Sequence, residues 1–125
     1  MKILVDTSFL LLMAELGRDL ISMAERQLND KLEPYIIEDI LKELENLCKK
    51  HSKKAFHART ALEIANRMSK LEAFGKGSVD RKLIETAKEY SMPIATNDFK
   101  LIREAKKEHV KILFMHRDLR ITLEE

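Results

Sequence analysis

Two aspartates each stand at the carboxyl end of a short predicted strand of this 125-residue chain. Asp6 follows Ile3–Val5, and Asp98 closes the run Ile94-Ala95-Thr96-Asn97-Asp98. Both segments are too short for helices and are predicted to be buried strands. In a parallel sheet the carboxyl ends of the strands meet at one edge, where ligands bind. We therefore expect the two carboxylates to converge.

Two further acids are expected at the same edge. Asp80 stands at the start of a helix that leads into the second of these strands, which returns its carboxylate to the two aspartates. A fourth acid must come from the helix predicted over residues 37–48. There Glu43 and Glu45 lie on opposite flanks, each about a quarter-turn from the centre of the apolar stripe. Helical spacing leaves both glutamates open as alternatives.

Such a cluster of carboxylates is suited to a hard cation. Crowded carboxylates repel one another and raise each other's pKa unless a positive charge lies between them. Mg²⁺ and Mn²⁺ prefer oxygen ligands, typically one or two carboxylates with water and substrate phosphate. A site of this kind can place a water in line with a phosphodiester and stabilise the leaving oxygen. The histidines show no zinc-site spacing and are expected at the surface: His51, His57, His109 and His116.

Asp6 also has a simpler interpretation. Asp is a favoured helix cap, and Thr7 and Ser8 offer further capping oxygens to a helix that is predicted to begin near Phe9 and to end at Gly17. Asp6 therefore either faces the positive end of this helix as a ligand to a cation, or caps the helix and does nothing else.

The elements that must position these acids alternate along the chain. Further strands are predicted around Pro34-Tyr35 and over 110–115, and the closing stretch 116–125 has room for one more short edge strand. Helices are predicted over 9–16, 20–28, 37–48, 55–71, from Ser78 or Asp80 to Tyr90, and over 99–107. Alternating strands and helices indicate parallel pairing with right-handed crossovers. We predict a three-layer α/β/α fold with a central, mainly parallel sheet of four to five strands.

Composition limits the class of protein. Residues 1–125 have the length of one domain. The 23 Lys and Arg residues against 21 Asp and Glu residues give a net charge of +2, so a nucleic-acid role must depend on local patches. Cys48 is the only cysteine, which excludes an intramolecular disulfide and a cysteine zinc site. No signal peptide or membrane span is recognised, so we expect a cytoplasmic protein without membrane association.

Four motifs occur in the order and at the spacing that resemble PIN-domain nucleases: Asp6-Thr7-Ser8, Ile40-Leu41-Lys42-Glu43-Leu44, Asp80 followed by Leu83-Ile84, and Ala95-Thr96-Asn97-Asp98. The match covers essentially the whole chain. The resemblance, and not helical spacing, selects Glu43 over Glu45. It implies a catalytic site in which Mg²⁺ or Mn²⁺ is bound by four acids: Asp6, Glu43, Asp80 and Asp98. It also implies that three neighbouring residues support these ligands: Thr7, Thr96 and Asn97.

The resemblance implies a ribonuclease that cuts single-stranded or structured RNA and leaves a 5′-phosphate. Within the family, the basic run Lys49–Lys54 and the ending His116–Arg120 resemble the branch that processes ribosomal RNA. One alternative is the toxin of a toxin–antitoxin pair, and another is a PIN-like domain that binds RNA or protein without cutting. The expected partners are RNA, an antitoxin or a ribosome-assembly protein, and a second copy in a homodimer. Arg117 and Arg120 either contact RNA phosphates or are solvated.

Two other classes of acidic α/β domain are excluded by the residues that follow Asp6. A receiver domain needs adjacent acids after its first strand, and a haloacid-dehalogenase-type phosphatase needs a second Asp two residues after the first. Thr7 and Ser8 occupy these positions.

Overall fold

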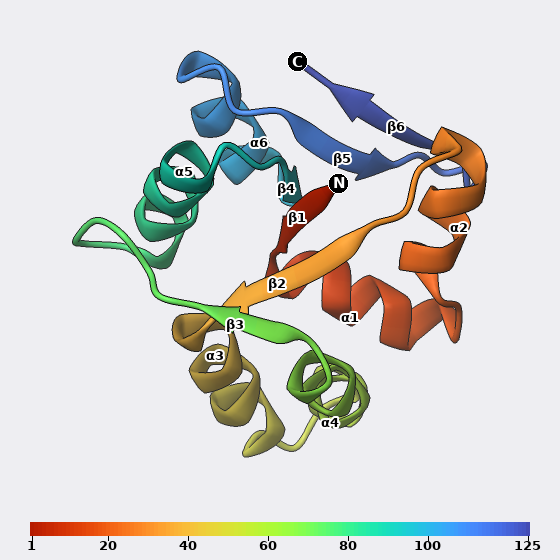
Figure 1. Cartoon of the computed structure of the whole chain (residues 1–125). Helices are drawn as coiled ribbons and strands as arrows, with labels where there is room; N and C mark the ends of the chain where they lie inside the picture. The colour runs from red at the N-terminus through yellow and green to blue at the C-terminus, as the bar shows by residue number, and fades with distance from the viewer.

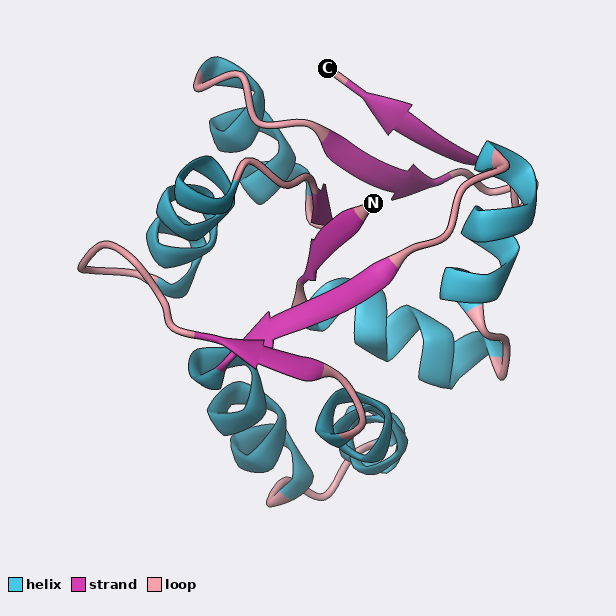
Figure 2. Ribbon diagram, viewed as in Figure 1, coloured by secondary structure: helices cyan, strands magenta, loops and turns pink.

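The computed structural model describes residues 1–125 and contains six strands and six helices. The strands are β1 Lys2–Val5, β2 Glu33–Ile37, β3 Ser69–Leu71, β4 Ile94–Ala95, β5 Ile112–Met115 and β6 Ile121–Glu124. The helices are α1 Thr7–Leu16, α2 Leu20–Leu28, α3 Glu38–Cys48, α4 Lys53–Asn66, α5 Val79–Tyr90 and α6 Phe99–Lys107. One sheet has the order β3-β2-β1-β4-β5-β6, with only β5 and β6 antiparallel (Figure 2). The predicted α/β class is confirmed.

The crossovers place helices on both faces of the sheet. From β1 the chain first adds β2 and β3 on one side, and later adds β4 and β5 on the other. Because crossovers between parallel strands are right-handed, α1 to α4 belong to one face and α5 and α6 to the other. Accordingly, α4 packs against both α1 and α3. Figure 1 shows α5 and α6 side by side, across the sheet from α1 and α2.

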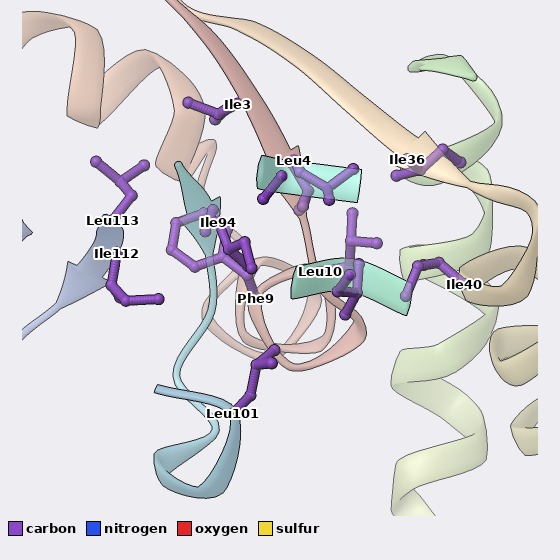
Figure 3. Packing of buried hydrophobic residues seen from close by; sticks show 14 of the residues in the cluster. Ile3, Leu4, Phe9, Leu10, Ile36, Ile40, Ile94, Leu101, Ile112 and Leu113 are labelled. Atoms are coloured by element: carbon purple, nitrogen blue, oxygen red, sulfur yellow. The ribbon is translucent and has the colours of Figure 1, made fainter. Parts of the chain in front are cut away.

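The helix α1 is the centre of the hydrophobic core. Phe9 and Leu10 are fully buried, as are Ile3–Val5 on β1. Figure 3 shows Phe9 and Leu10 surrounded by side chains from neighbouring strands and from α3 and α6. Burying one such large side chain contributes about 1.5–3 kcal/mol relative to leaving it exposed. The junction of β1 and α1, where Asp6 lies, is therefore held rigidly by packing.

The ends of the helices agree in part with the prediction. α1 begins at Thr7 rather than near Phe9, so the predicted capping by Thr7 and Ser8 is wrong, because both lie within the first turn. Gly17 ends α1 with a φ of 61°, the left-handed conformation that glycine adopts without strain. Asp19 caps α2 through its side chain, as predicted. None of the six helices has the length and hydrophobicity that a membrane span requires.

The largest error of prediction concerns β3. The fourth helix ends at Asn66 and not at Leu71, and Ser69–Leu71 pairs in parallel with β2. The sheet therefore has six strands instead of four to five. Met68 and Leu71 continue the helical spacing of α4 in the sequence, whereas β3 is a three-residue edge strand with an exposed Ser69 and Lys70. Such a segment has no apolar alternation by which a strand is recognised. The short edge strand for which the stretch 116–125 had room is present as β6.

Candidate functional site

The strand order reverses between β1 and β4, and a pocket of about 300 Å³ lies where these strands end. All four acids that the sequence predicted line this pocket: Asp6, Glu43, Asp80 and Asp98. Glu45 does not line it. The structure thus separates the two glutamates that helical spacing left open. We call this cavity the four-acid pocket; its other wall residues are Thr7, Ser8, Leu11, Leu47 and Lys54.

Each acid reaches the pocket from a different part of the chain. Asp6 joins β1 to α1, and Asp98 is the N-cap of α6 just beyond β4. Asp80 lies in the first turn of α5, whose N-cap is Ser78. Glu43 is half-buried in the middle of α3. Parallel pairing of β1 with β4 brings the first two acids together, and the helices that lead to and from the sheet add the others.

Asp6 is the most deeply buried of the four, with 6% of its surface exposed. Its Oδ2 atom accepts hydrogen bonds from Thr96 Oγ1 at 2.7 Å and from Ser8 Oγ at 2.9 Å. Asp6 occupies the N-cap position of α1, but its side chain makes no capping hydrogen bond. The structure therefore does not support helix capping as the role of this carboxylate.

Thr96 connects two of the acids. It is fully buried, and its hydroxyl accepts a hydrogen bond from the Asp98 N–H at 3.1 Å while donating to Asp6. The same Oγ1 lies 3.0 Å from Ser8 Oγ. A single hydroxyl thus fixes the Asp6 carboxylate relative to the backbone of Asp98.

Asn97 and Ser8 complete this network. The Asn97 side chain donates to the Met115 carbonyl at 3.0 Å and accepts from the Met115 N–H at 3.3 Å, which continues the pairing of β4 with β5 beyond the end of β4. The Asn97 N–H donates to Ser8 Oγ at 3.0 Å. Ser8 was not predicted as a site residue, although a hydroxyl two residues after Asp6 was the available signal.

The pocket carries an excess of negative charge, because four acids and one lysine line it. Burial raises the pKa of Asp6 above its usual range, and the hydrogen bonds from Thr96 and Ser8 offset this only in part. The pKa of Asp80 is also raised, first by burial and then by the charges of Asp6 and Asp98. None of the four acids takes part in an ion pair. A cation bound among them would relieve both the repulsion and the loss of solvation.

The donor atoms of the pocket suit Mg²⁺ or Mn²⁺. All four acids offer oxygen ligands, which these hard cations prefer. Thr7 Oγ1 is the one buried side-chain N or O atom without a hydrogen-bond partner, and Thr7 lines the same pocket. As the side chains stand, no group of three or more His, Cys, Asp or Glu residues is arranged to hold a metal ion. Binding therefore requires side-chain rotation, which the partly exposed Glu43 and Asp80 permit.

The basic residues singled out in the sequence separate into two groups. Within the run Lys49–Lys54, only Lys54 lines the four-acid pocket. The sequence did not distinguish Lys54 from the rest of this run. Arg117 and Arg120 are exposed on the turn between β5 and β6 and do not line the pocket.

Comparisons with known proteins agree with this architecture. A family model described as a PIN-like domain matches residues 3–118. The structure of the PIN domain endonuclease Utp24 superposes with a TM-score of 0.79 and 26% sequence identity, covering 98% of this chain and 90% of that one. Among curated proteins, no match was found.

Two more distant structures show the fold alone. A domain of a functionally unknown protein from Methanocaldococcus jannaschii DSM 2661 has a TM-score of 0.67 at 19% identity, covering 92% of this chain and 91% of that one. A chain of VapBC2 from Rickettsia felis, bound to a DNA fragment from its promoter, has a TM-score of 0.65 at 14% identity, covering 91% of this chain and 98% of that one.

Proposed function

Because the chain belongs to the PIN-like domain family, we propose that it is a metal-dependent ribonuclease that hydrolyses phosphodiester bonds in the four-acid pocket. A fold does not specify a reaction, so the proposal depends on the site. The observation that carries it is the convergence of four carboxylates on one pocket without a basic partner in an ion pair. They are Asp6, Glu43, Asp80 and Asp98.

The residues of the pocket divide into a fixed part and an adjustable part. Asp6 is held by two hydroxyls and is the anchoring ligand for Mg²⁺ or Mn²⁺. Glu43, Asp80 and Asp98 are partly or fully exposed and complete the ligand set by side-chain rotation. The bound ion supplies the Lewis acidity that favours attack of water on a phosphodiester. Lys54 in the pocket wall offers a point charge to a substrate phosphate that would otherwise meet only carboxylates.

The substrate that we propose is RNA, in the context of ribosomal RNA processing. The basic run Lys49–Lys54 reaches the pocket through Lys54, and the exposed Arg117 and Arg120 add positive charge at another part of the surface. The alternative of a toxin has in its favour only a likeness at 14% identity, which carries information about the fold and not about the role.

A cleavage assay with matched glutamate variants tests this proposal. End-labelled structured and single-stranded RNAs are incubated with the wild type, Asp6→Asn, Glu43→Gln or Glu45→Gln, in Mn²⁺, Mg²⁺ or EDTA. We expect metal-dependent cutting that falls by about 100-fold or more in Asp6→Asn and Glu43→Gln, because loss of a ligand should cost at least as much as the roughly 10- to 100-fold that loss of a residue supporting a ligand costs. Glu45→Gln is the control, because Glu45 is exposed on the same helix and lies outside the pocket.

Metal binding is measured separately from activity. An ion that binds only the folded chain raises Tm by mass action, by an amount that increases with its concentration. We expect Mn²⁺ to raise the Tm of the wild type and of Glu45→Gln but not that of Asp6→Asn. Cutting in EDTA, or equal losses in Glu43→Gln and Glu45→Gln, would refute the assigned site. RNA binding without cutting by any form would leave the non-catalytic module as the better proposal.

A further inference from the structure

A row of three aromatic side chains starts beside the four-acid pocket. Phe99 is the first residue of α6 and directly follows Asp98. Its ring centroid lies 6.1 Å from that of Phe114 on β5, which in turn lies 4.9 Å from that of His116 in an edge-to-face arrangement. We call Phe99, Phe114 and His116 the aromatic row. None of the three lines the pocket, and only Phe99 is adjacent in sequence to a residue that does.

The first ring of the row is not part of the core. Phe99 is 65% exposed, the highest value among the exposed large hydrophobic residues. The inward face of α6 is instead formed by Leu101, Ile102 and Ala105. Single exposed apolar residues are common on protein surfaces. A row of neighbouring rings that begins next to a predicted catalytic acid is a different feature, because a molecule bound at that acid lies within reach of the exposed Phe99 ring.

The other end of the row is held in place by the sheet. Phe114 is paired with Thr122 across β5 and β6. The His116 ring nitrogen Nε2 lies 2.8 Å from Thr122 Oγ1 and 3.5 Å from Glu124 Oε2. The His116 N–H also donates to the Arg120 carbonyl at 2.8 Å. A surface that is already ordered before binding loses little conformational freedom when it is occupied.

Cations lie at both ends of the aromatic row. Lys100 follows Phe99 and is exposed, and it lies near enough to Asp80 to oppose the rise in the pKa of that residue. Arg117 directly follows His116, and neither Arg117 nor Arg120 takes part in an ion pair. The rings are thus bordered by positive charges that are free to meet phosphates.

We infer that the aromatic row stacks unpaired bases of single-stranded RNA next to the bond that lies in the four-acid pocket; the inference rests on the proposed function. Every base offers a π-face to an aromatic ring, and stacking of this kind is tolerant of sequence. Bases in a duplex are already stacked on one another, so only an unpaired strand can use the row. Exposed aromatic surface with cations at both ends suits a strand that carries both bases and phosphates better than it suits an apolar protein interface.

A fluorescence measurement that needs no cleavage tests this inference. A 12-nucleotide single-stranded RNA that carries 2-aminopurine is titrated with protein in EDTA, because stacking of this base quenches its emission. The variants are Phe99→Leu, Phe99→Trp and Tyr90→Leu. We expect Phe99→Leu to reduce the quenching and to weaken binding roughly 5- to 150-fold, the loss per stacked base. Phe99→Trp should retain both properties, because it restores an aromatic ring.

Tyr90→Leu is the matched control. Tyr90 is 39% exposed and packs edge-to-face on Phe74, but it lies at the end of α5 opposite Asp80. Its substitution should leave binding unchanged. Equal affinity and equal quenching for the wild type and Phe99→Leu would overturn the inference, even if the wild type cuts RNA. Loss of self-association in Phe99→Leu without any change in RNA binding would overturn it too, by assigning the row to a contact between copies.

The two proposals fail in different ways in this experiment. If the wild type quenches 2-aminopurine through Phe99 but cuts no RNA in Mn²⁺, the stacking role of Phe99 is supported and the nuclease proposal is refuted. If the wild type cuts RNA and Phe99→Leu binds and cuts RNA as well as the wild type does, the nuclease proposal is supported and the stacking role of Phe99 is refuted.

Discussion

Replacing Thr96 by Val removes one hydroxyl and almost nothing else. The two side chains have nearly the same shape, so no cavity is created in this fully buried position. The variant loses the 2.7 Å hydrogen bond that the hydroxyl donates to Asp6 Oδ2 and the 3.1 Å hydrogen bond that it accepts from the Asp98 N–H. The Asp6 carboxylate, which is itself buried, then keeps only the hydroxyl of Ser8 as a side-chain donor.

The size of the effect follows from the charge on Asp6. A hydrogen bond to a charged group contributes about 1.5–3 kcal/mol, and a buried group left without its partner loses a similar amount. We expect Thr96→Val to lower the free energy of unfolding by about 2–3 kcal/mol. A chain of 125 residues has an unfolding entropy of about 0.26 kcal/mol/K at its midpoint, so Tm should fall by roughly 8–11 °C.

Thermal unfolding followed by circular dichroism at pH 8 measures this change, with Thr60→Val as the control. Thr60 is exposed on α4 and its side chain makes no hydrogen bond, so its substitution should shift Tm by less than about 2 °C. If Thr96→Val unfolded within 2 °C of the wild type, the hydroxyl would not support Asp6 in the way the distances indicate. Asp6 would then not be held in position by Thr96.

Substitutions at four other positions test the electrostatics and the backbone. Hydrogen bonds from Arg81 lower the pKa of Glu108 from 4.5 to about 2, so Glu108 stabilises the fold above pH 4.5 and loses this contribution as the pH falls toward 2. Glu108→Gln should therefore cost about 1 kcal/mol in urea unfolding at pH 7 and almost nothing at pH 2. Because the pKa of Asp6 is raised, its charge destabilises the fold at neutral pH, so Asp6→Asn should raise Tm at pH 7 and leave it unchanged below pH 3.8. Gly75→Ala should lower the free energy of unfolding by about 2–4 kcal/mol, because φ at Gly75 is 90° and an added Cβ would lie 2.8 Å from Glu85 Cγ. Gly17→Ala should lower it by only about 1–2 kcal/mol, because an added Cβ at Gly17 would meet no atom within 4 Å.

For each of these substitutions, one outcome would contradict the expected physical cause. A loss of stability in Glu108→Gln that is the same at pH 2 and pH 7 would show that packing, and not charge, is responsible. A lower Tm for Asp6→Asn at pH 7 would mean that the hydrogen bonds of Asp6 outweigh its burial. Equal effects of Gly75→Ala and Gly17→Ala would show that the loop around Gly75 adjusts to the added atom.

The part of the site that sequence could predict is the part that depends on strand direction. Asp6 and Asp98 follow two strands, and parallel strands end at the same edge whatever their side chains are. The return of Asp80 to that edge follows from the same rule. Strand direction does not single out Thr96 and Asn97, whose supporting role was predicted from the resemblance to PIN-domain nucleases.

The part that sequence could not predict depends on how helices rotate and where they begin. Glu43 and Glu45 are equivalent on a helical wheel, so Glu43 was predicted from the family resemblance and not from helical spacing. The packing of α3 against α4 and the sheet turns Glu43 toward the pocket. Lys54 lies in the first turn of α4, and nothing in the composition of the basic run distinguishes it from the neighbouring lysines. The strand β3 could not be predicted because it forms by pairing with β2 and its own composition is not typical of a strand.

The strand β4 has only two residues and lies between β1 and β5. During synthesis, β1 emerges first but cannot complete its hydrogen bonds on that side until Ile94 and Ala95 have followed, almost three-quarters of the chain later. A nascent chain that has not reached these residues holds the carboxylate of Asp6 without the hydroxyl of Thr96, and it exposes an unpaired apolar strand edge. The four-acid pocket is therefore assembled only when folding is nearly complete, and a chain arrested before β4 is prone to aggregation.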